Sequence, residues 1–252
     1  MSQSIISNIA RKPMNSKKQT ITALLPMKAH SERVKSKNFR DIAGKPLFRW
    51  ILDSLMAVEA IDNVVINTDA REILSSNGLN TGDYDGRVII RDRKPDICGD
   101  FVSMNLILED DVDAIESDIY FMTHTTNPLL SPKTIETMIK NYKAALLKNE
   151  ADSLFTVNKH QTRFYTPEGG AINHDPDNLI RTQDLAPYLE ENSVGYFFTK
   201  NSFKTTSARI GKKPILFETP PLESVDIDEV EDWFMAEALL MRVKDGTSLP
   251  EQ

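Results

Sequence analysis

The sequence predicts an α/β fold, with a Rossmann-like, mainly parallel sheet, helices on both faces and a small β-hairpin excursion. Short apolar runs alternate with segments of helical period over residues 21–147, which is the order of successive βαβ units. These runs are continuously apolar, as is typical of strands buried on both faces. The alternation of predicted strands and helices stops after residue 157, and two turn-rich clusters follow. The excursion is predicted there.

The first half of the chain can be assigned element by element. The run at 21–25 predicts the first strand, which ends at Pro26, and a polar loop continues to about Gly44. Pro46 opens a helix with apolar residues at helical spacing. A strand at 63–67, a short helix, a strand at 88–90, a helix at 102–108 and a strand at 120–123 are expected next. Ser131 and Pro132 then begin a clear amphipathic helix.

The second half contains fewer regular elements. Strands are predicted at 154–157, 194–199 and 215–219, and a last helix at 229–241. Residues 158–193 are expected to project as a subdomain used for dimerisation and sugar binding. The polar residues 1–19 are interpreted as a disordered N-terminal extension. The remainder, residues 20–252, is predicted to form one domain.

Composition and charge exclude several classes of protein. The net charge of −7 argues against a protein that coats nucleic acid, and no apolar run has the length needed to cross a bilayer. The single cysteine, Cys98, is typical of a reducing compartment, so a cytoplasmic location is expected. Residues 28–45 nevertheless contain six cations and two acids. This local excess of positive charge indicates a small polyanionic ligand.

The basic segment directly follows the first predicted strand. Its Lys28, Ser31, Arg33 and Lys37 offer the ammonium, hydroxyl and guanidinium donors that hold phosphate groups. The segment lacks the GxxxxGK[ST] pattern of a P-loop. A solvated basic loop is the alternative, but a loop at the carboxyl end of an α/β strand favours a phosphate site.

A second group of candidate residues lies in the segment SVDIDEVED, residues 224–232. In an extended chain Asp226 and Asp228 project to the same side, where two carboxylates share a divalent cation such as Mg²⁺. Asp228 has an alternative role as the N-cap of the last helix, with Glu231 completing a capping box. Asp226 has no such local role.

A third group consists of polar residues near strand ends, at 123–130 and 191–196. His124 is a candidate for substrate contact, although a lone histidine is more often structural. Asn192 and Tyr196 are also candidates, with turn and core positions as the alternatives. None of these three is specific alone.

Several short motifs occur in a characteristic order. They are KNFR at 37–40, AGKPL at 43–47, Thr68-Asp69, the spacing of Arg93, Asp100 and Ser103, Pro128-Leu129, RTQDL at 181–185, Glu191-Asn192 with Tyr196, and VDID at 225–228. Together they resemble the acylneuraminate cytidylyltransferases, the CMP-sugar synthetases, over residues 21–242.

The resemblance implies a nucleotidyltransferase domain that transfers CMP from CTP to an acidic keto sugar, sialic-acid-like or ketodeoxyoctulosonate-like, and releases pyrophosphate. It also implies Mg²⁺ as cofactor and a homodimer, without nucleic acid or membrane partners. The implied phosphate ligands are Lys28, Ser31 and Lys37, and the implied nucleotide ligands are Asn38, Arg93, Asp100 and Ser103. The implied sugar ligands are His124, Asn192 and Tyr196, and the implied metal ligands are Asp226 and Asp228. Lys28, Lys37 and Asp226 are the expected catalytic residues.

The phosphate loop departs from the family pattern. Lys28 replaces an arginine, Glu32 replaces a lysine, and Arg33 and Lys35 stand at the usual glycine and proline positions. Arg33 or Lys35 is therefore expected to supply the missing phosphate contact. His124 replaces a glutamine. Two alternatives follow: a nucleotidyltransferase or glycosyltransferase of the same fold with another nucleotide, and a non-catalytic relative that binds nucleotides or sugar phosphates.

Overall fold

The computed structural model describes residues 18–31 and 33–245. Most of the expected N-terminal extension, residues 1–17, and the departure at Glu32 lie outside the described residues. Lys18, which was assigned to the extension, forms an ion pair with Asp62 at 2.9 Å. No helix in the described ranges is long and apolar enough to span a membrane.

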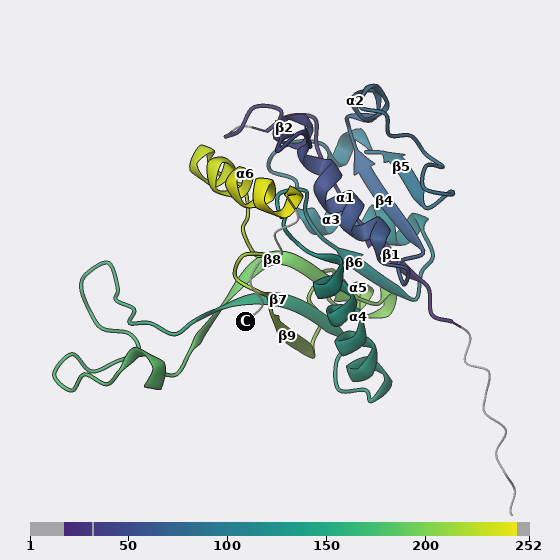
Figure 1. Ribbon diagram of the computed structural model, residues 1–252. Helices are drawn as coiled ribbons and strands as arrows, with labels where there is room; N and C mark the ends of the chain where they lie inside the picture. The colour runs from purple at the N-terminus through teal and green to yellow at the C-terminus, as the bar shows by residue number, and fades with distance from the viewer. Residues whose placement is uncertain (1–17, 32, 246–252) are drawn as a thin grey trace, which may run out of the picture.

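A seven-stranded sheet forms the centre of the molecule (Figure 1), in the order β5-β4-β1-β6-β8-β7-β9. Its strands are β1 (Ile21–Leu24), β4 (Asn63–Thr68), β5 (Val88–Asp92), β6 (Ile119–Met122), β7 (Ser153–His160), β8 (Tyr188–Phe198) and β9 (Pro214–Glu218). Neighbours among β5, β4, β1 and β6 are parallel, and β8 is antiparallel to both β6 and β7. The predicted mainly parallel α/β fold is confirmed.

Helices cover both faces of the sheet. The core on one face includes residues of α1 (Leu47–Ala57), α2 (Arg71–Ser76) and α4 (Pro132–Leu147). The core on the other face includes residues of α3 (Met104–Ala114) and α5 (Lys200–Thr206). Successive side chains of β1 point to opposite faces of the sheet. Ala23 therefore packs in the core on the first face, and Leu24 packs in the core on the second. Helix α5 was not predicted, and α3 begins two residues after the expected start.

A third core attaches the last helix, α6 (Val230–Lys244), to the segment after β1. Trp233 and Leu240 of α6 pack with Ile42 of the small hairpin β2 (Asp41–Ile42) and β3 (Lys45–Pro46). The guanidinium of Arg40 lies 4.6 Å from the centre of the Trp233 ring, a cation–π contact. This packing brings the start of α6 to the basic loop, although the two are remote in sequence.

The N-cap of α6 is Glu229, which forms a capping box with Asp232. The prediction that Asp228 caps this helix with Glu231 was therefore wrong by one residue. The sequence contains acids at 226, 228, 229, 231 and 232, so spacing alone does not fix the helix start. Since Glu229 accepts the backbone donor, the Asp228 carboxylate is available for other partners.

The carboxyl ends of β1, β4 and β6 meet at one edge of the sheet because these strands are parallel. The chain continues this alignment beyond the strands, with an isolated bridge between Met27 and Thr68 and a hydrogen bond from Thr123 N to Leu24 O of 3.2 Å. In the antiparallel register of β8, Tyr196 lies opposite Met122. The amino-terminal half of β8 thus reaches the same edge.

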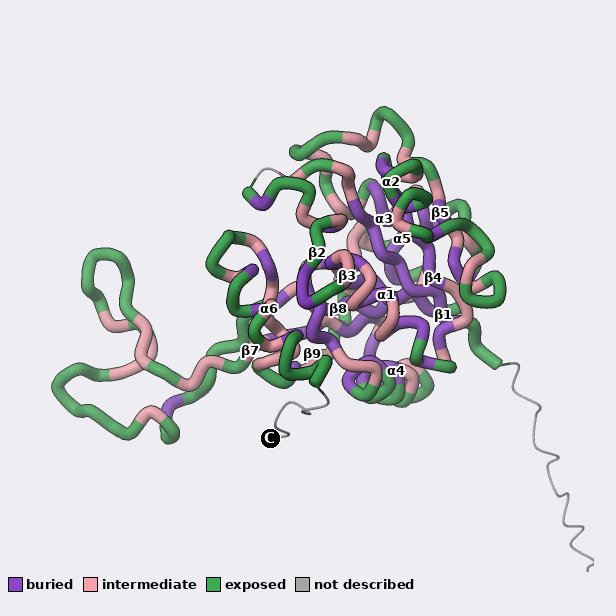
Figure 2. The backbone as a smooth tube through the Cα atoms, turned by 45° about the horizontal axis from the view of Figure 1, so that its top comes forward, coloured by how far each residue is buried: buried purple, intermediate pink, exposed green. Residues whose placement is uncertain are grey.

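The predicted excursion projects from the domain (Figure 1). Strands β7 and β8 pair out to His160 and Tyr188, and residues 161–187 continue as turns with the 3₁₀ helix η3 (Thr182–Asp184). Most of this arm is exposed, whereas the body has a continuous buried core (Figure 2). The arm therefore lacks a hydrophobic core of its own.

Candidate active site

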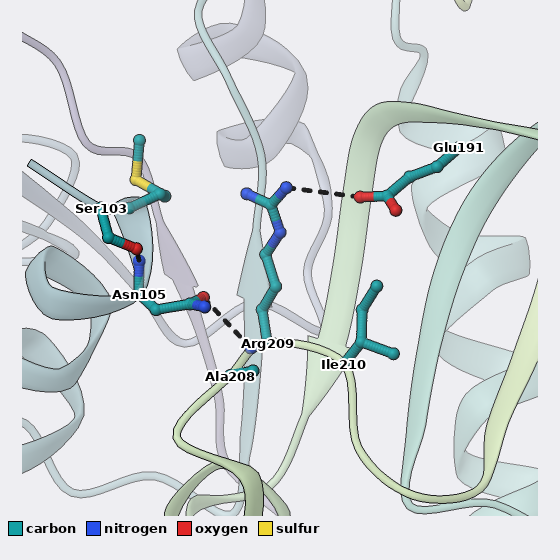
Figure 3. Close-up of a pocket in the computed structure, with 7 residues that line it drawn as sticks. Ser103, Asn105, Glu191, Ala208, Arg209 and Ile210 are labelled. Carbon is teal, nitrogen blue, oxygen red and sulfur yellow. Dashed lines mark hydrogen bonds and ion pairs between the residues drawn. The ribbon is translucent and has the colours of Figure 1, made fainter. Parts of the chain in front are cut away.

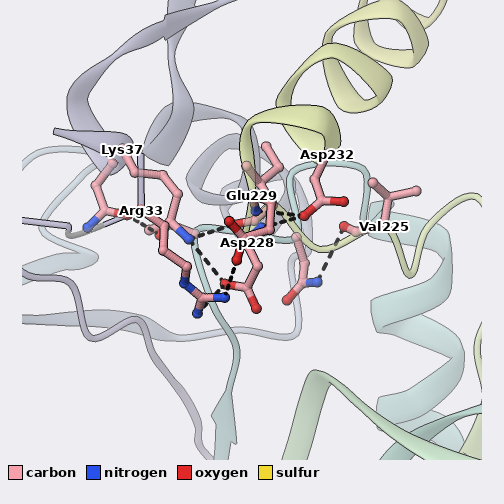
Figure 4. A network of polar contacts seen from close by, with 10 residues as sticks. Arg33, Lys37, Val225, Asp228, Glu229 and Asp232 are labelled. Carbon is pink, nitrogen blue, oxygen red and sulfur yellow. Dashed lines mark hydrogen bonds and ion pairs between the residues drawn. The ribbon is translucent and has the colours of Figure 1, made fainter. Parts of the chain in front are cut away.

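An ion-pair network joins the basic loop to the segment before α6 (Figure 4). Lys37 Nζ lies 3.4 Å from Asp228 Oδ1 and also donates to the Ile227 carbonyl. The Lys37 side chain is only 11% exposed, whereas that of Asp228 is 48% exposed. The ammonium of Lys37 is therefore mostly shielded from solvent, whereas the carboxylate of Asp228 is accessible. Solvent screens the positive charge of Lys37 only weakly.

Arg33 lies on the outer side of this network. Its guanidinium reaches Asp228 at 3.3 Å and Glu229 at 2.8 Å, and these contacts raise its pKa, with the Glu229 hydrogen bond as the largest cause. The structure therefore brings Arg33 together with Lys37 at Asp228. In the free protein both cations neutralise Asp228.

Asp226 is positioned differently from Asp228. Its pKa is raised by burial and by repulsion from Asp228, and a hydrogen bond from Thr126 opposes the rise. One carboxylate oxygen, Oδ1, is buried and has no hydrogen-bond partner among the described residues. An unpartnered buried acceptor is costly, and a hard cation satisfies such an oxygen.

These two carboxylates fit a Mg²⁺ ion that takes its other ligands from phosphate and water. Within residues 18–31 and 33–245, no group of three or more His, Cys, Asp or Glu side chains gathers as a metal cage. A two-carboxylate site is the arrangement expected where the nucleotide supplies further oxygens. The unpartnered Oδ1 of Asp226 is the observation that supports this fit.

Lys28 and Asp100, predicted to contact phosphate and nucleotide, form an ion pair with each other. The backbone N–H of Ala29 donates to Asp69 at 2.7 Å, which ties the loop to the end of β4. Ser31 is half-buried in the same loop. Lys28 is 39% exposed, so its ammonium is accessible to a phosphate from solvent.

Asn38 lies in the 3₁₀ turn η1 (Lys37–Phe39) and is 7% exposed. Its amide donates to the Lys28 carbonyl at 2.8 Å and accepts from the Thr125 hydroxyl at 2.6 Å. Asn38 therefore connects the start of the loop to the segment after β6. The preceding Ser36 has φ of 52°, a left-handed turn that directs η1 back toward the sheet.

Arg93 follows β5 and is held by backbone and side-chain acceptors. Its guanidinium donates to Met27 O at 3.1 Å, Asn67 O at 2.8 Å and Asn67 Oδ1 at 3.0 Å. The Asn67 amide in turn donates to Asp111 at 2.8 Å. Burial raises the pKa of Asp111 to about 6 against the opposing effect of Asn67 and Arg91. Asn67 and Asp111 were not identified from the sequence, since both sit within ordinary strand and helix patterns.

His124 lies just beyond β6 and is half-buried. Burial lowers its pKa to about 4, and the positive charges of Arg209 and Lys37 act in the same direction. The imidazole is therefore neutral at pH 7.

Tyr196 is fully buried, and burial raises the pKa of its hydroxyl to about 12. The hydroxyl bonds to Glu191 and, at 3.2 Å, to Ser193. The Arg209 guanidinium lies 3.9 Å from the centre of the Tyr196 ring. The buried Tyr196 thus holds Glu191 through its hydroxyl and Arg209 through its ring.

Asn192 and Ser103 have their polar groups engaged within the protein. Asn192 donates to Asn158 at 2.9 Å and to Thr219 at 2.6 Å, and its carbonyl accepts from Val194 N. Ser103 caps α3 by accepting from Asn105 N at 3.3 Å. A direct sugar contact of Asn192 and a direct nucleotide contact of Ser103 stay predictions.

A cavity of about 400 Å³ lies where the start of α3, strand β8 and the loop after α5 meet (Figure 3). It is lined by residues 103–105 at the start of α3, by Glu191 of β8 and by residues 208–210 after α5. Arg209 was missed by sequence reasoning, because a single arginine in a loop carries no pattern. Only the tertiary packing brings it next to Tyr196.

Comparison with known proteins assigns the chain to a family. A cytidylyltransferase family model matches residues 22–240. The chain is 29% identical over 238 residues to N-acylneuraminate cytidylyltransferase A of Danio rerio, covering 91% of this chain and 53% of that protein. It is 24% identical over 239 residues to CMP-N,N'-diacetyllegionaminic acid synthase of Legionella pneumophila, covering 87% of this chain and 96% of that protein.

Solved structures support the fold. A 4-diphosphocytidyl-2C-methyl-D-erythritol synthase from Anaerococcus prevotii superposes with a TM-score of 0.63 at 14% identity, over 90% of this chain and 100% of that one. A CMP:2-keto-3-deoxy-manno-octonic acid synthetase complexed with CTP gives 0.61 at 16% identity, over 89% and 99%. The chain spans about half the length of the first vertebrate relatives it matches. The matched region takes in the basic loop, the strand ends and the Asp226–Asp228 segment, and the chain belongs to the cytidylyltransferase family.

Proposed function

We propose that this protein transfers CMP from CTP to an acidic keto sugar of the sialic acid type and releases pyrophosphate. The observation that carries the proposal is the meeting of Lys37 with Asp228, 3.4 Å apart, at the edge where β1, β4 and β6 end. There the loop cations and the two carboxylates face one ligand region, as a nucleotide tail and its metal require. The names of the relatives support a sugar acid as acceptor.

The reaction requires in-line attack of the sugar's anomeric hydroxyl on the α-phosphorus of CTP. An oxygen–phosphorus bond forms, the bond to the β-phosphate oxygen breaks, and the hydroxyl proton leaves to a base or to solvent. In this scheme Lys28, Arg33 and Lys37 neutralise charge on the triphosphate, and the attack is accelerated by orientation and charge stabilisation. No covalent enzyme intermediate is needed.

Asp226 and Asp228 are the residues proposed to hold Mg²⁺, which when bound supplies charge neutralisation at the phosphate oxygens. A bound metal nucleotide would compete with the ion pairs that Arg33 and Lys37 make with Asp228. The two cations would then pair with phosphate oxygens. The buried Oδ1 of Asp226, which has no partner among the described residues, would be available as a metal ligand.

We further propose a homodimer formed through the arm. Leu179 is 63% exposed and Ile180 46% exposed, and at the base of the arm Tyr188 and Leu189 are 47% and 46% exposed. Such apolar exposure on a projecting segment is typical of an association surface. A cytoplasmic location, expected from the single cysteine, stays a prediction.

Pyrophosphate release tests the function directly. The purified protein is incubated with Mg²⁺, each of CTP, UTP, ATP and GTP, and a panel of sialic, legionaminic, pseudaminic and ketodeoxyoctulosonic acids. Release only with CTP and a sugar acid supports the proposal. Release with another nucleotide selects a different nucleotidyltransferase. Stabilisation by CTP in a thermal shift assay without turnover on any acceptor selects the non-catalytic relative.

A further inference from the structure

Arg209 is one of the residues that line the cavity, and its guanidinium points toward Glu191 (Figure 3). The Arg209 side chain is 22% exposed. Its backbone N–H donates to the Asn105 side chain at 3.4 Å, and its guanidinium rests on the Tyr196 ring at 3.9 Å. The cation is therefore fixed at both its backbone and its head group while remaining accessible from the cavity.

The polar edge of this guanidinium has capacity for another acceptor. Stacking on an aromatic ring uses the flat face of the group, whereas its five N–H donors point outward in the plane. The contact with Glu191 is a single one from one terminal nitrogen, at 3.4 Å, which is long for a charged hydrogen bond. A planar anion can bind along the remaining edge without displacing the ring contact.

Glu191 gives the cavity a second charge of opposite sign. Its carboxylate accepts from the Tyr196 hydroxyl and from Arg209, and its side chain is 41% exposed. A carboxylate at this place repels a polyphosphate but accepts hydrogen bonds from hydroxyl groups. One arginine and one glutamate in a cavity of about 400 Å³ therefore match a molecule that carries both a single anion and several hydroxyls.

The cavity lies close to the segment that carries His124, because Arg209 rests on Tyr196 and Tyr196 pairs with Met122, two residues before His124. This imidazole feels the positive charge of Arg209 as well as that of Lys37, so the arginine lies near the phosphate end of the site but belongs to a separate set of residues. The phosphate end already has Lys28, Arg33 and Lys37. A ligand that spans His124 would place its reacting hydroxyl toward Lys37 and its anionic group toward Arg209.

We propose that Arg209 binds the carboxylate of the acidic sugar and that Glu191 accepts hydrogen bonds from its hydroxyls, so that this cavity selects sugar acids over neutral sugars. The inference deepens the proposed function and rests on it. Arg209 here acts as a specificity residue, because a planar carboxylate fits its fork of donors.

The test compares a sugar acid with its uncharged ester in two variants. Arg209→Met removes the cation and keeps an apolar side chain over Tyr196, and Lys200→Met removes a cation of the neighbouring helix α5 that pairs with Glu116 at 2.8 Å. Calorimetry measures binding of N-acetylneuraminate and its methyl ester to each protein with Mg²⁺ and a non-hydrolysable CTP analogue present. Melting curves establish that each variant is folded.

Wild type and Lys200→Met are expected to bind the acid about 10- to 100-fold more tightly than the ester, the range for a charge-assisted hydrogen-bonded pair. Arg209→Met is expected to bind both equally, with unchanged affinity for the CTP analogue. Equal binding of acid and ester by wild type, or a preference for the acid that persists in Arg209→Met, overturns the proposal. If CTP binds and acid preference depends on Arg209 but no pyrophosphate is released, the transferase function fails while this assignment stands.

Discussion

Lys37 Nζ lies 3.4 Å from Asp228 Oδ1 although 191 positions separate the two residues in the chain. The contact is made possible by the packing of α6 on the β2–β3 hairpin, in which Trp233 and Leu240 join Ile42. Lys37, the proposed phosphate ligand, and Asp228, the proposed metal ligand, thus neutralise each other in this contact. Under the proposed function, a bound metal nucleotide would offer both charges new partners.

Replacement of Lys37 should impair catalysis more than folding. Lys37→Met removes a nearly buried ammonium that the proposed mechanism uses to stabilise charge in the transition state, so kcat/KM for CTP is expected to fall about 100- to 1,000-fold. Arg33 still pairs with Asp228, which limits the loss of stability. Lys148→Met, at an exposed ion pair of 4.0 Å, is the control. An equal loss of activity in both variants would contradict the role of Lys37.

Asp226→Asn should abolish stabilisation by Mg²⁺ and CTP together. The substitution removes a carboxylate whose pKa is raised by burial and by Asp228, so the free protein is expected to keep its melting temperature or gain a few degrees. The measured quantity is the shift in melting temperature on adding Mg²⁺ and CTP. Asp85→Asn, on an exposed loop where φ is 58°, is the control. Retention of the full shift and of pyrophosphate release in Asp226→Asn would refute the metal site.

His124 should act as a neutral group at physiological pH. Its pKa falls from 6.5 to about 4, so the unfolded chain takes up a proton first as the pH falls from 6.5 to 4. The folded protein therefore loses up to about 3 kcal/mol of stability over this range. His124→Gln, which cannot titrate, should lose less stability between pH 7 and 4.5 in urea unfolding. A larger acid-side loss in the variant would show that the histidine is protonated in the folded protein.

Asp111 should produce the opposite pH dependence. Its pKa rises from 3.8 to about 6 in the folded protein, so the stability that it contributes is present below pH 3.8 and is lost as the pH rises through 6. The stability of Asp111→Asn relative to wild type is thus expected to increase by about 2 kcal/mol between pH 4.5 and 7.5. Denaturant unfolding at both pH values provides the measurement, and a difference that does not change with pH would be inconsistent with this burial effect.

The proposed dimer can be tested at the arm. Leu179→Asp places a charge on a residue that is 63% exposed in the single chain, and a charge buried without a partner at an interface weakens association by several kcal/mol. Light scattering after size exclusion should show a dimer for wild type and a monomer for the variant. Leu147→Asp, at a position 85% exposed near the end of α4, should remain dimeric. A monomeric wild-type protein would exclude the arm as a dimerisation surface.

The sequence by itself determined the local elements and the chemistry they carry. The apolar run at 21–25, the helix start at Ser131 and the basic composition of residues 28–45 are local properties, and the structure reproduces them as β1, the capped start of α4 and the loop cations of the site. Ordering the strands in a parallel sheet also put Lys28, Asp69 and His124 near one edge. Strand polarity alone requires this arrangement.

The tertiary structure decided which residues of the site contact each other. The start of α6 at Glu229, the chain from Asp111 through Asn67 to Arg93 and the position of Arg209 on Tyr196 depend on which helix face meets which strand. Contacts between residues far apart in sequence are selected by packing of the whole core, in which many pairings are locally equivalent. The sequence therefore predicted which groups would hold phosphate, whereas the folded arrangement decided which carboxylates they face and which cavity lies beside them.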